Sequence, residues 1–258
     1  MRTCVLLALL TALTACETSP VEWRDPEPVP PDTPAGRLVI DSTGKPRFVD
    51  ERVSVAAAPT APGLCASSLQ TARGSSRVFA AWWSVRPDSS AVLYSASSAD
   101  SGATWGNAVA VDTSDVSSRG CDRPPPSLAT VGDDLQTAYS MSASEGTGVF
   151  FAHFMGSMLH SPVSVIYGER LVPTAIAADG ERVVVAYEEP NGARKQVDVS
   201  MSTTQGHLFD WHVTASRDID VASSPSVALA GKTLAVSWVT RRPADSVGTR
   251  VVRVGHLQ

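Results

Sequence analysis

The stretch Ser98-Ala-Asp100-Ser-Gly102-Ala-Thr104-Trp105 lies between two short segments rich in β-forming residues. Asp100 can accept hydrogen bonds from backbone N–H groups of its own turn, and Gly102 tolerates the positive φ that such a turn needs. Trp105 then supplies a large apolar side chain that folds back against the strands. The pattern, with Ser98 and Thr104 included, predicts a tight hairpin turn held by its own side chains, so we interpret it as scaffold.

Around this turn, short β-type segments that end on a large aromatic side chain recur at intervals of about 50 residues. They occupy residues 77–82, 134–139, 182–187 and 232–238. Shorter strand-like segments stand before and after each one, and helical periodicity is weak throughout. Several short strands in a repeat of this length are typical of a propeller blade. The sequence therefore predicts an all-β chain that forms a β-propeller of about four to five four-stranded blades.

The last repeat ends at Leu257 without a fourth strand. A strand from the N-terminal part of the domain, either 36–41 or 52–56, is expected to complete this blade and close the ring, because propellers protect their strand edges in this way. Residues 37–62 are also the candidate source of a fifth blade.

The motif at 98–105 resembles the Asp box, the bacterial neuraminidase repeat of sialidase-like propellers, at all five of its marker positions. The third repeat carries a partial copy, in which Ser202 and Gly206 match, Thr204 replaces the aspartate and Trp211 stands further on. The resemblance implies a turn between the third and fourth strands of a blade, on the face opposite the catalytic pocket of that family. It identifies an architecture and does not by itself imply an activity.

The N-terminus resembles the export signal of bacterial lipoproteins. One positive charge precedes the apolar run 5–15, which is too short to span a bilayer. The run ends in Leu13-Thr-Ala-Cys16, which is similar to a lipobox. The resemblance implies that 1–15 is a signal peptide and that Cys16 receives lipid, which would anchor an exported protein facing the periplasm or the cell surface. The alternative is an ordinary signal peptide followed by a coincidental cysteine.

Residues 16–36 are rich in proline and acidic side chains, so we expect an extended tether that cannot bury enough apolar surface to fold. Residues 37–258 then form the propeller domain, which is long enough for a full core. The net charge of −5 includes no basic block, so nucleic acid is not expected as a partner.

Two cysteines, Cys65 and Cys121, remain in the predicted domain, at near-equivalent places in consecutive repeats. In an exported protein such a pair is expected to form a disulfide. The five histidines show no metal-binding spacing with acids or cysteines, so surface or turn roles are expected, with no metal and no cofactor. We expect a monomer.

Two repeats carry an acid followed by an arginine where the chain enters an inner strand. These pairs are Asp122-Arg123 and Glu169-Arg170, and Arg119 stands close to the first. Arginines that converge on a central channel can hold a carboxylate or a sugar acid through paired hydrogen bonds. The alternative, which the pattern favours, is that each arginine pairs with an acid of a neighbouring loop.

Catalysis of the sialidase type needs three arginines, a tyrosine nucleophile beside a glutamate, and an acid. Only weak candidates exist, namely Tyr167 with Glu169 and Asp122. The early aromatic-Arg-Ile-Pro motif of the family has no match. We therefore expect a non-catalytic cell-envelope module that binds glycans or an envelope protein. A sialidase-like glycoside hydrolase and an envelope assembly scaffold remain the alternatives, so enzymatic activity is left open.

Overall fold

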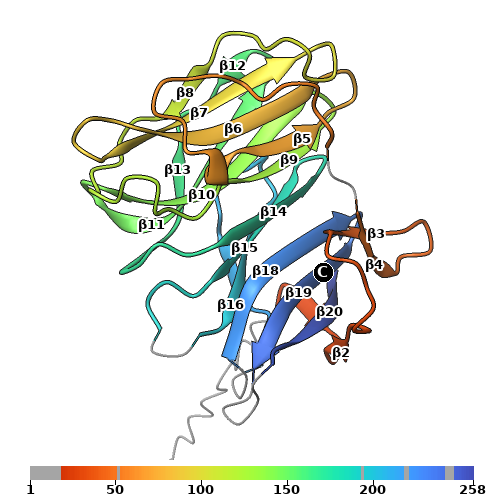
Figure 1. Cartoon of the computed structure of the whole chain (residues 1–258). Helices are drawn as coiled ribbons and strands as arrows, with labels where there is room; N and C mark the ends of the chain where they lie inside the picture. The colour runs from red at the N-terminus through yellow and green to blue at the C-terminus, as the bar shows by residue number, and fades with distance from the viewer. Residues whose placement is uncertain (1–18, 51–52, 193–194, 218–220, 242–246) are drawn as a thin grey trace, which may run out of the picture.

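A computed structural model describes residues 19–50, 53–192, 195–217, 221–241 and 247–258 (Figure 1). The predicted signal peptide 1–15 and the predicted lipidation site Cys16 lie outside the described residues. Within the described part, no helix is long and apolar enough to cross a membrane. The regular structure there is strand, apart from one short 3-10 helix, η1 (Ala66–Ser68), so the all-β prediction is confirmed.

Four antiparallel sheets carry most of the chain, and each takes its first three strands from consecutive segments. Sheet 1 contains β5 (Gln70–Arg73), β6 (Val78–Val85), β7 (Ala91–Ser98) and β8 (Val109–Asp112). Sheet 2 contains β9 (Ser127–Val131), β10 (Asp134–Ala143), β11 (Gly146–Met155), β12 (Met158–Leu159) and β13 (Val163–Gly168). Sheet 3 contains β14 (Thr174–Asp179), β15 (Arg182–Glu188), β16 (Val197–Ser202) and β17 (Trp211–Thr214). Sheet 4 contains β18 (Val221–Ala230), β19 (Thr233–Arg241), β20 (Thr249–Leu257), β1 (Val21–Trp23) and β2 (Glu27–Pro28).

A two-stranded hairpin, β3 (Arg37–Ile40) with β4 (Pro46–Val49), stands beside sheet 4. The first strands of the sheets, β5, β9, β14 and β18, contact one another in that order, and β3 contacts β18. Figure 1 shows the sheets fanned about these strands. This radial order of first strands is the arrangement of a β-propeller.

The segment that completes sheet 4 differs from the prediction. Strand β1 pairs with β20, with Val21 opposite Leu257 and Trp23 opposite Gly255, and the red N-terminal segment accordingly lies beside the blue C-terminal strands in Figure 1. Val21 is buried in the apolar cluster between sheets 3 and 4. A Cβ at Gly255 would lie 2.4 Å from Val21, so only glycine permits this approach.

Two expectations about the N-terminal region are therefore wrong. The segment 16–36, expected to be a tether, supplies β1 and β2, which both pair with β20. The exposed edge of β20 is already formed, so a strand of only a few residues is sufficient to pair with it. Neither of the two candidate closing strands pairs with β20. Residues 37–40 pair with β4 instead, and the described part of 52–56 belongs to no strand.

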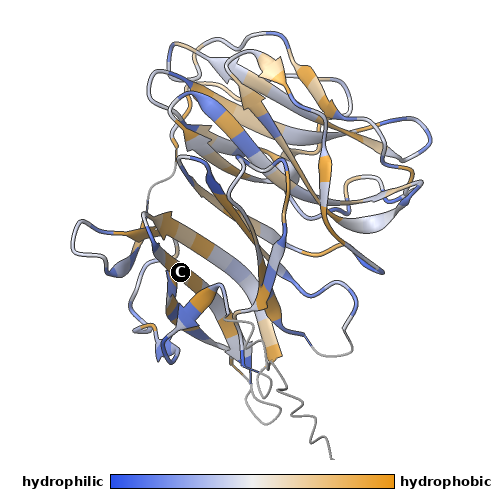
Figure 2. Ribbon diagram, turned by 180° about the vertical axis from the view of Figure 1, so that it is seen from behind, coloured by the Kyte–Doolittle hydropathy of each residue, from blue (hydrophilic) through white to orange (hydrophobic). Residues whose placement is uncertain are grey.

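The large aromatic side chains that end the repeated segments lie in the core. Trp82, Tyr139, Tyr187 and Trp238 are all fully buried. Apolar clusters fill the spaces between neighbouring sheets, and Figure 2 shows the strongly hydrophobic stretches concentrated on the strands. This burial between sheets is what holds the first strands around a common centre.

Candidate functional site

The turn at 98–105 connects β7 to β8 and is held by its own side chains. The Oγ of Ser98 accepts from the N–H of Gly102 (2.8 Å) and donates to Asp100 (2.7 Å). The carboxylate of Asp100 also accepts from the N–H (2.9 Å) and the hydroxyl (2.6 Å) of Thr104. These bonds lower the pKa of Asp100 to about 2, with the Thr104 hydroxyl as the largest cause. The Trp105 indole donates to the carbonyl of Ala57 (2.8 Å), which ties the turn to the incoming chain.

Arg123, a predicted ligand residue, is buried and bonded to other residues of its loop. It lies in the loop from β8 to β9, is 7% exposed, and forms a buried ion pair with Asp115 (2.5 Å). Its guanidinium also donates to the carbonyls of Gly120 and Ser117. Asp115 in turn accepts from the N–H of Ala91 (3.0 Å). These bonds fix the loop against sheet 1, so a ligand could reach Arg123 only by breaking them.

The other two residues predicted on this loop, Arg119 and Asp122, pair with each other. They form a solvent-exposed ion pair at 3.7 Å, an arrangement that contributes little stability. Cys65 and Cys121 form a disulfide with their Cα atoms 5.5 Å apart, which joins the loop to the segment before β5.

The second predicted pair, Glu169 and Arg170, follows β13. Arg170 donates to the carbonyls of Glu189 (2.6 Å) and Gly192 (3.3 Å), while Glu169 is exposed. Tyr167, the candidate nucleophile, lies on β13, the outer strand of sheet 2, and its ring packs edge-on against Phe150. The candidate catalytic residues Tyr167, Glu169 and Asp122 thus lie on an outer strand or in loops, and none is on a first strand.

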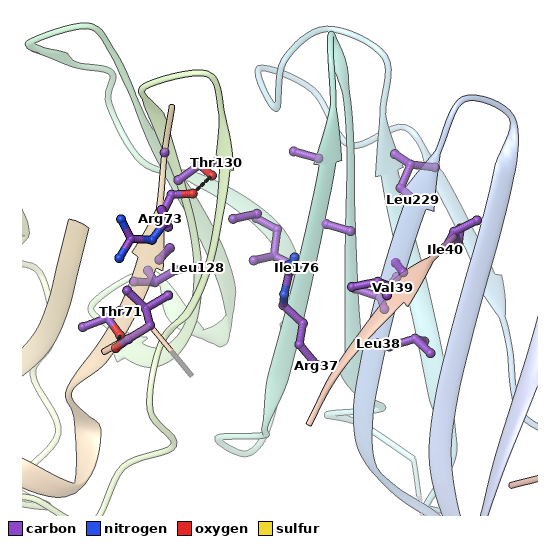
Figure 3. Close-up of a pocket in the computed structure, with 18 residues that line it drawn as sticks. Arg37, Leu38, Val39, Ile40, Thr71, Arg73, Leu128, Thr130, Ile176 and Leu229 are labelled. Carbon is purple, nitrogen blue, oxygen red and sulfur yellow. Dashed lines mark hydrogen bonds between the residues drawn. The ribbon is translucent and has the colours of Figure 1, made fainter. Parts of the chain in front are cut away.

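The first strands enclose a pocket of about 470 Å³, shown in Figure 3. Its walls are apolar or small side chains of β3, β5, β9, β14 and β18, such as Leu38, Ile176 and Leu229. Two arginines complete it, Arg37 at the start of β3 and Arg73 at the end of β5. The residues that line the pocket include no acid and no tyrosine.

Sequence reasoning missed this pocket because neither arginine belongs to a recognisable motif. Arg73 ends a short strand and Arg37 begins a hairpin, and β4 and η1 lie between the two strands in the sequence. Only the predicted fold could have indicated this pocket. A propeller places its first strands around the centre, so polar side chains on those strands are the ones to inspect.

Sheet 3 contains another carboxyl with a shifted pKa. Asp198 on β16 has its pKa raised to about 7, first because it is buried and then because the carboxyl of Glu189 is a neighbour. The two acids stand on either side of the connection between β15 and β16, which is why their approach is not visible as a sequence motif. Asp198 is not among the residues that line the central pocket.

The expectation that the histidines have only surface or turn roles is wrong for His153. This side chain is 3% exposed, and His160 and His207 lie against it. The nitrogen atoms of the three rings that could bind a metal all lie within 4.8 Å of one another. The residues come from two sheets, so spacing along the chain could not predict their meeting.

Neither a known protein family nor a curated protein matches the amino-acid sequence. Solved structures are similar in fold. A protein of unknown function from Dyadobacter fermentans DSM 18053 has a TM-score of 0.55 and 15% identity, covering 73% of this chain and 52% of that one. At this identity the likeness shows a shared fold.

Weaker structural matches include two glycosidases. A Trypanosoma rangeli sialidase has a TM-score of 0.49 and 14% identity over 83% of this chain and 39% of that one. A xylan β-1,4-xylosidase from Bacillus halodurans C-125 has a TM-score of 0.45 and 10% identity over 85% of this chain and 52% of that one. The chain thus spans about half the length, or less, of these three proteins.

Proposed function

We propose that this protein is a non-catalytic module that binds glycans carrying a carboxylate, with the central pocket as the binding site. The observation that carries the proposal is the composition of the pocket, which is lined by apolar side chains together with two exposed arginines, Arg37 and Arg73. Apolar walls with a few fixed polar groups are typical of small-molecule sites, and guanidinium groups recognise carboxylates.

The lining also argues against hydrolysis as the main activity. Sialidase-type chemistry requires an activated nucleophile and a proton donor next to the scissile bond. The residues that line the pocket offer neither a tyrosine nor an acid, and Tyr167 lies on an outer strand. Export and lipidation at Cys16 remain part of the proposal, and mass spectrometry of the mature N-terminus tests them separately.

A glycan array with the full chain tests the binding site. We expect selective retention on sialylated or uronic-acid glycans, and a loss of affinity of about tenfold or more in Arg73→Ala, because a hydrogen bond to a charged group is lost. Arg37→Ala is expected to behave similarly. Arg119→Ala is the matched control, since this arginine lies on the loop between β8 and β9 and does not line the pocket.

Three outcomes would contradict the proposal. Retention on no glycan would leave a protein partner as the alternative. Equal losses of glycan affinity in Arg119→Ala and Arg73→Ala would show that binding does not depend specifically on the pocket. Release of free sugar during the incubation would favour the hydrolase.

A further inference from the structure

Three histidines from separate segments form a cluster on the outer part of sheets 2 and 3. His153 lies on β11, and the short strand β12 folds the chain back so that the N–H of His160 donates to the carbonyl of His153 (3.0 Å). His207 comes from the turn between β16 and β17. The ring centroids are 4.5 Å apart for His153 and His160, and 4.9 Å apart for His153 and His207.

The position of His207 is set by the packing between the two sheets. Gly206 lies so close to Phe151 that a Cβ there would be 2.0 Å from the ring. The next aromatic, Phe209, packs edge-on against the same ring with centroids 5.3 Å apart. The backbone on both sides of His207 is therefore held against sheet 2, so the approach of His207 to His153 follows from the core.

The nitrogen atoms of the cluster are short of partners. The Nε2 atoms of His153 and His160 are buried and accept or donate no hydrogen bond among the described residues. Buried polar atoms are almost always paired, so such atoms call for a ligand that the polypeptide does not supply. A neutral imidazole keeps the lone pair that a metal ion needs.

We propose that His153, His160 and His207 bind one divalent transition-metal ion of the zinc class. Imidazole nitrogen suits zinc and its first-row neighbours, whereas magnesium and calcium prefer oxygen. In a tetrahedral site with Zn–N distances of about 2.0 Å, ligand nitrogens lie about 3.4 Å apart. In this structure the three candidate nitrogens lie within 4.8 Å of one another. Zinc binding therefore requires only a small inward movement of the rings, which the exposed His207 can make.

A bound ion would join sheet 2 to sheet 3 by linking β11 and the β12 return to the turn of the neighbouring sheet. Ligands that bind only the folded state raise its stability. The metal site is independent of the glycan proposal, because none of the three histidines lines the central pocket.

The test uses the full chain without a histidine-containing affinity tag, titrated with ZnCl₂ by calorimetry after treatment with a chelator. We expect one zinc ion per chain and an increase in melting temperature that the chelator reverses. His207→Ala should weaken zinc binding by about tenfold or more, because even residues that only orient a ligand cost that much. This variant removes an exposed side chain and leaves the core intact. His256→Ala is the matched control, since His256 is exposed on β20 and outside the cluster.

Cobalt(II) provides a second measurement that does not depend on stability. Binding to the cluster should give the visible absorption of a nitrogen-ligated ion, and this absorption should be absent in His207→Ala. Zinc binding of equal strength in wild type and His207→Ala would overturn the proposal. So would the absence of zinc binding by the wild type, or a preference for magnesium or calcium.

Discussion

The turn at 98–105 in sheet 1 and the turn at 202–209 in sheet 3 share one hydrogen bond from a glycine N–H to a serine side chain, but they are stabilised by different interactions. In both, a serine Oγ accepts from the glycine N–H four residues later, at 2.8 Å in the first turn and 3.0 Å in the second. Both glycines have positive φ, +81° at Gly102 and +87° at Gly206. The common geometry identifies the two turns as versions of one structural device.

Their side chains show the difference. Asp100 accepts from both the hydroxyl and the N–H of Thr104. The Thr204 hydroxyl instead accepts from the N–H of Leu208 (3.2 Å) and shares a hydrogen bond with the Ser202 hydroxyl (3.2 Å). The aromatic that follows the turn is half-buried Trp105 in sheet 1 but fully packed Phe209 in sheet 3. The first turn is stabilised from within and the second by the neighbouring sheet, which explains how the second tolerates the loss of its aspartate.

The largest effect is expected where the second turn meets the core. Gly206→Ala should lower the free energy of unfolding by about 3 kcal/mol, because it adds strain at positive φ to overpacking against the buried ring of Phe151. Gly102→Ala should cost less, about 1 to 2 kcal/mol, because the Cβ meets Val55 in a segment without regular structure that can move aside. Denaturant unfolding measures both values.

Gly156→Ala separates the two causes. This glycine also has positive φ, +60°, but a Cβ there meets nothing within 4 Å. The loss of unfolding free energy in Gly156→Ala therefore measures the backbone strain alone. If Gly206→Ala proved no more costly than Gly156→Ala, the second turn would not depend on the neighbouring sheet.

The two turns also show which features could be predicted from the sequence alone. The motif at 98–105 and the regular spacing of buried aromatics were sufficient to predict an all-β chain with repeated sheets, because both are local signals. The aromatic at the place of Trp105 in the second turn is Phe209, seven residues after the serine in each turn, and it packs between the sheets. The closing strand was missed because Val21 and Trp23 are too few apolar residues to stand out in a proline-rich segment.

The candidate sites were harder to predict for a related reason. Arg123 lies beside an acid in the sequence, Asp122, yet its true partner is Asp115. Arg37 and Arg73 line one pocket only because first strands surround it, and His207 contacts His153 only because two sheets pack together. Such contacts depend on the tertiary arrangement, so no local pattern records them.

Acid should affect the two turns differently. The pKa of Asp100 is lowered to about 2 from an ordinary value of 3.8, so its contribution is fully present above pH 3.8 and is lost as the pH falls toward 2. Asp100→Asn should therefore be less stable than wild type at pH 7 and nearly equal to it at pH 2. Thr204→Val removes a group that does not titrate, so its difference from wild type should be the same at both values. Thermal unfolding across this range measures both differences, and a pH-independent effect of Asp100→Asn would show that the carboxylate is not what braces the turn.

The smallest effect is expected from restoring the missing aspartate. Thr204→Asp places a carboxylate where it can accept from the N–H of Leu208, but position 208 carries no hydroxyl to match that of Thr104. Only part of the network can form, so a gain of at most about 0.5 kcal/mol is expected, within the usual range for exposed substitutions. The double variant Thr204→Asp with Leu208→Thr completes the network and should gain more than the sum of its parts, because neighbouring groups that bind each other are not additive. Chemical denaturation of the two single variants and the double variant measures this coupling. A coupling of zero would mean that packing against Phe151 already holds the turn and leaves the carboxylate nothing to stabilise.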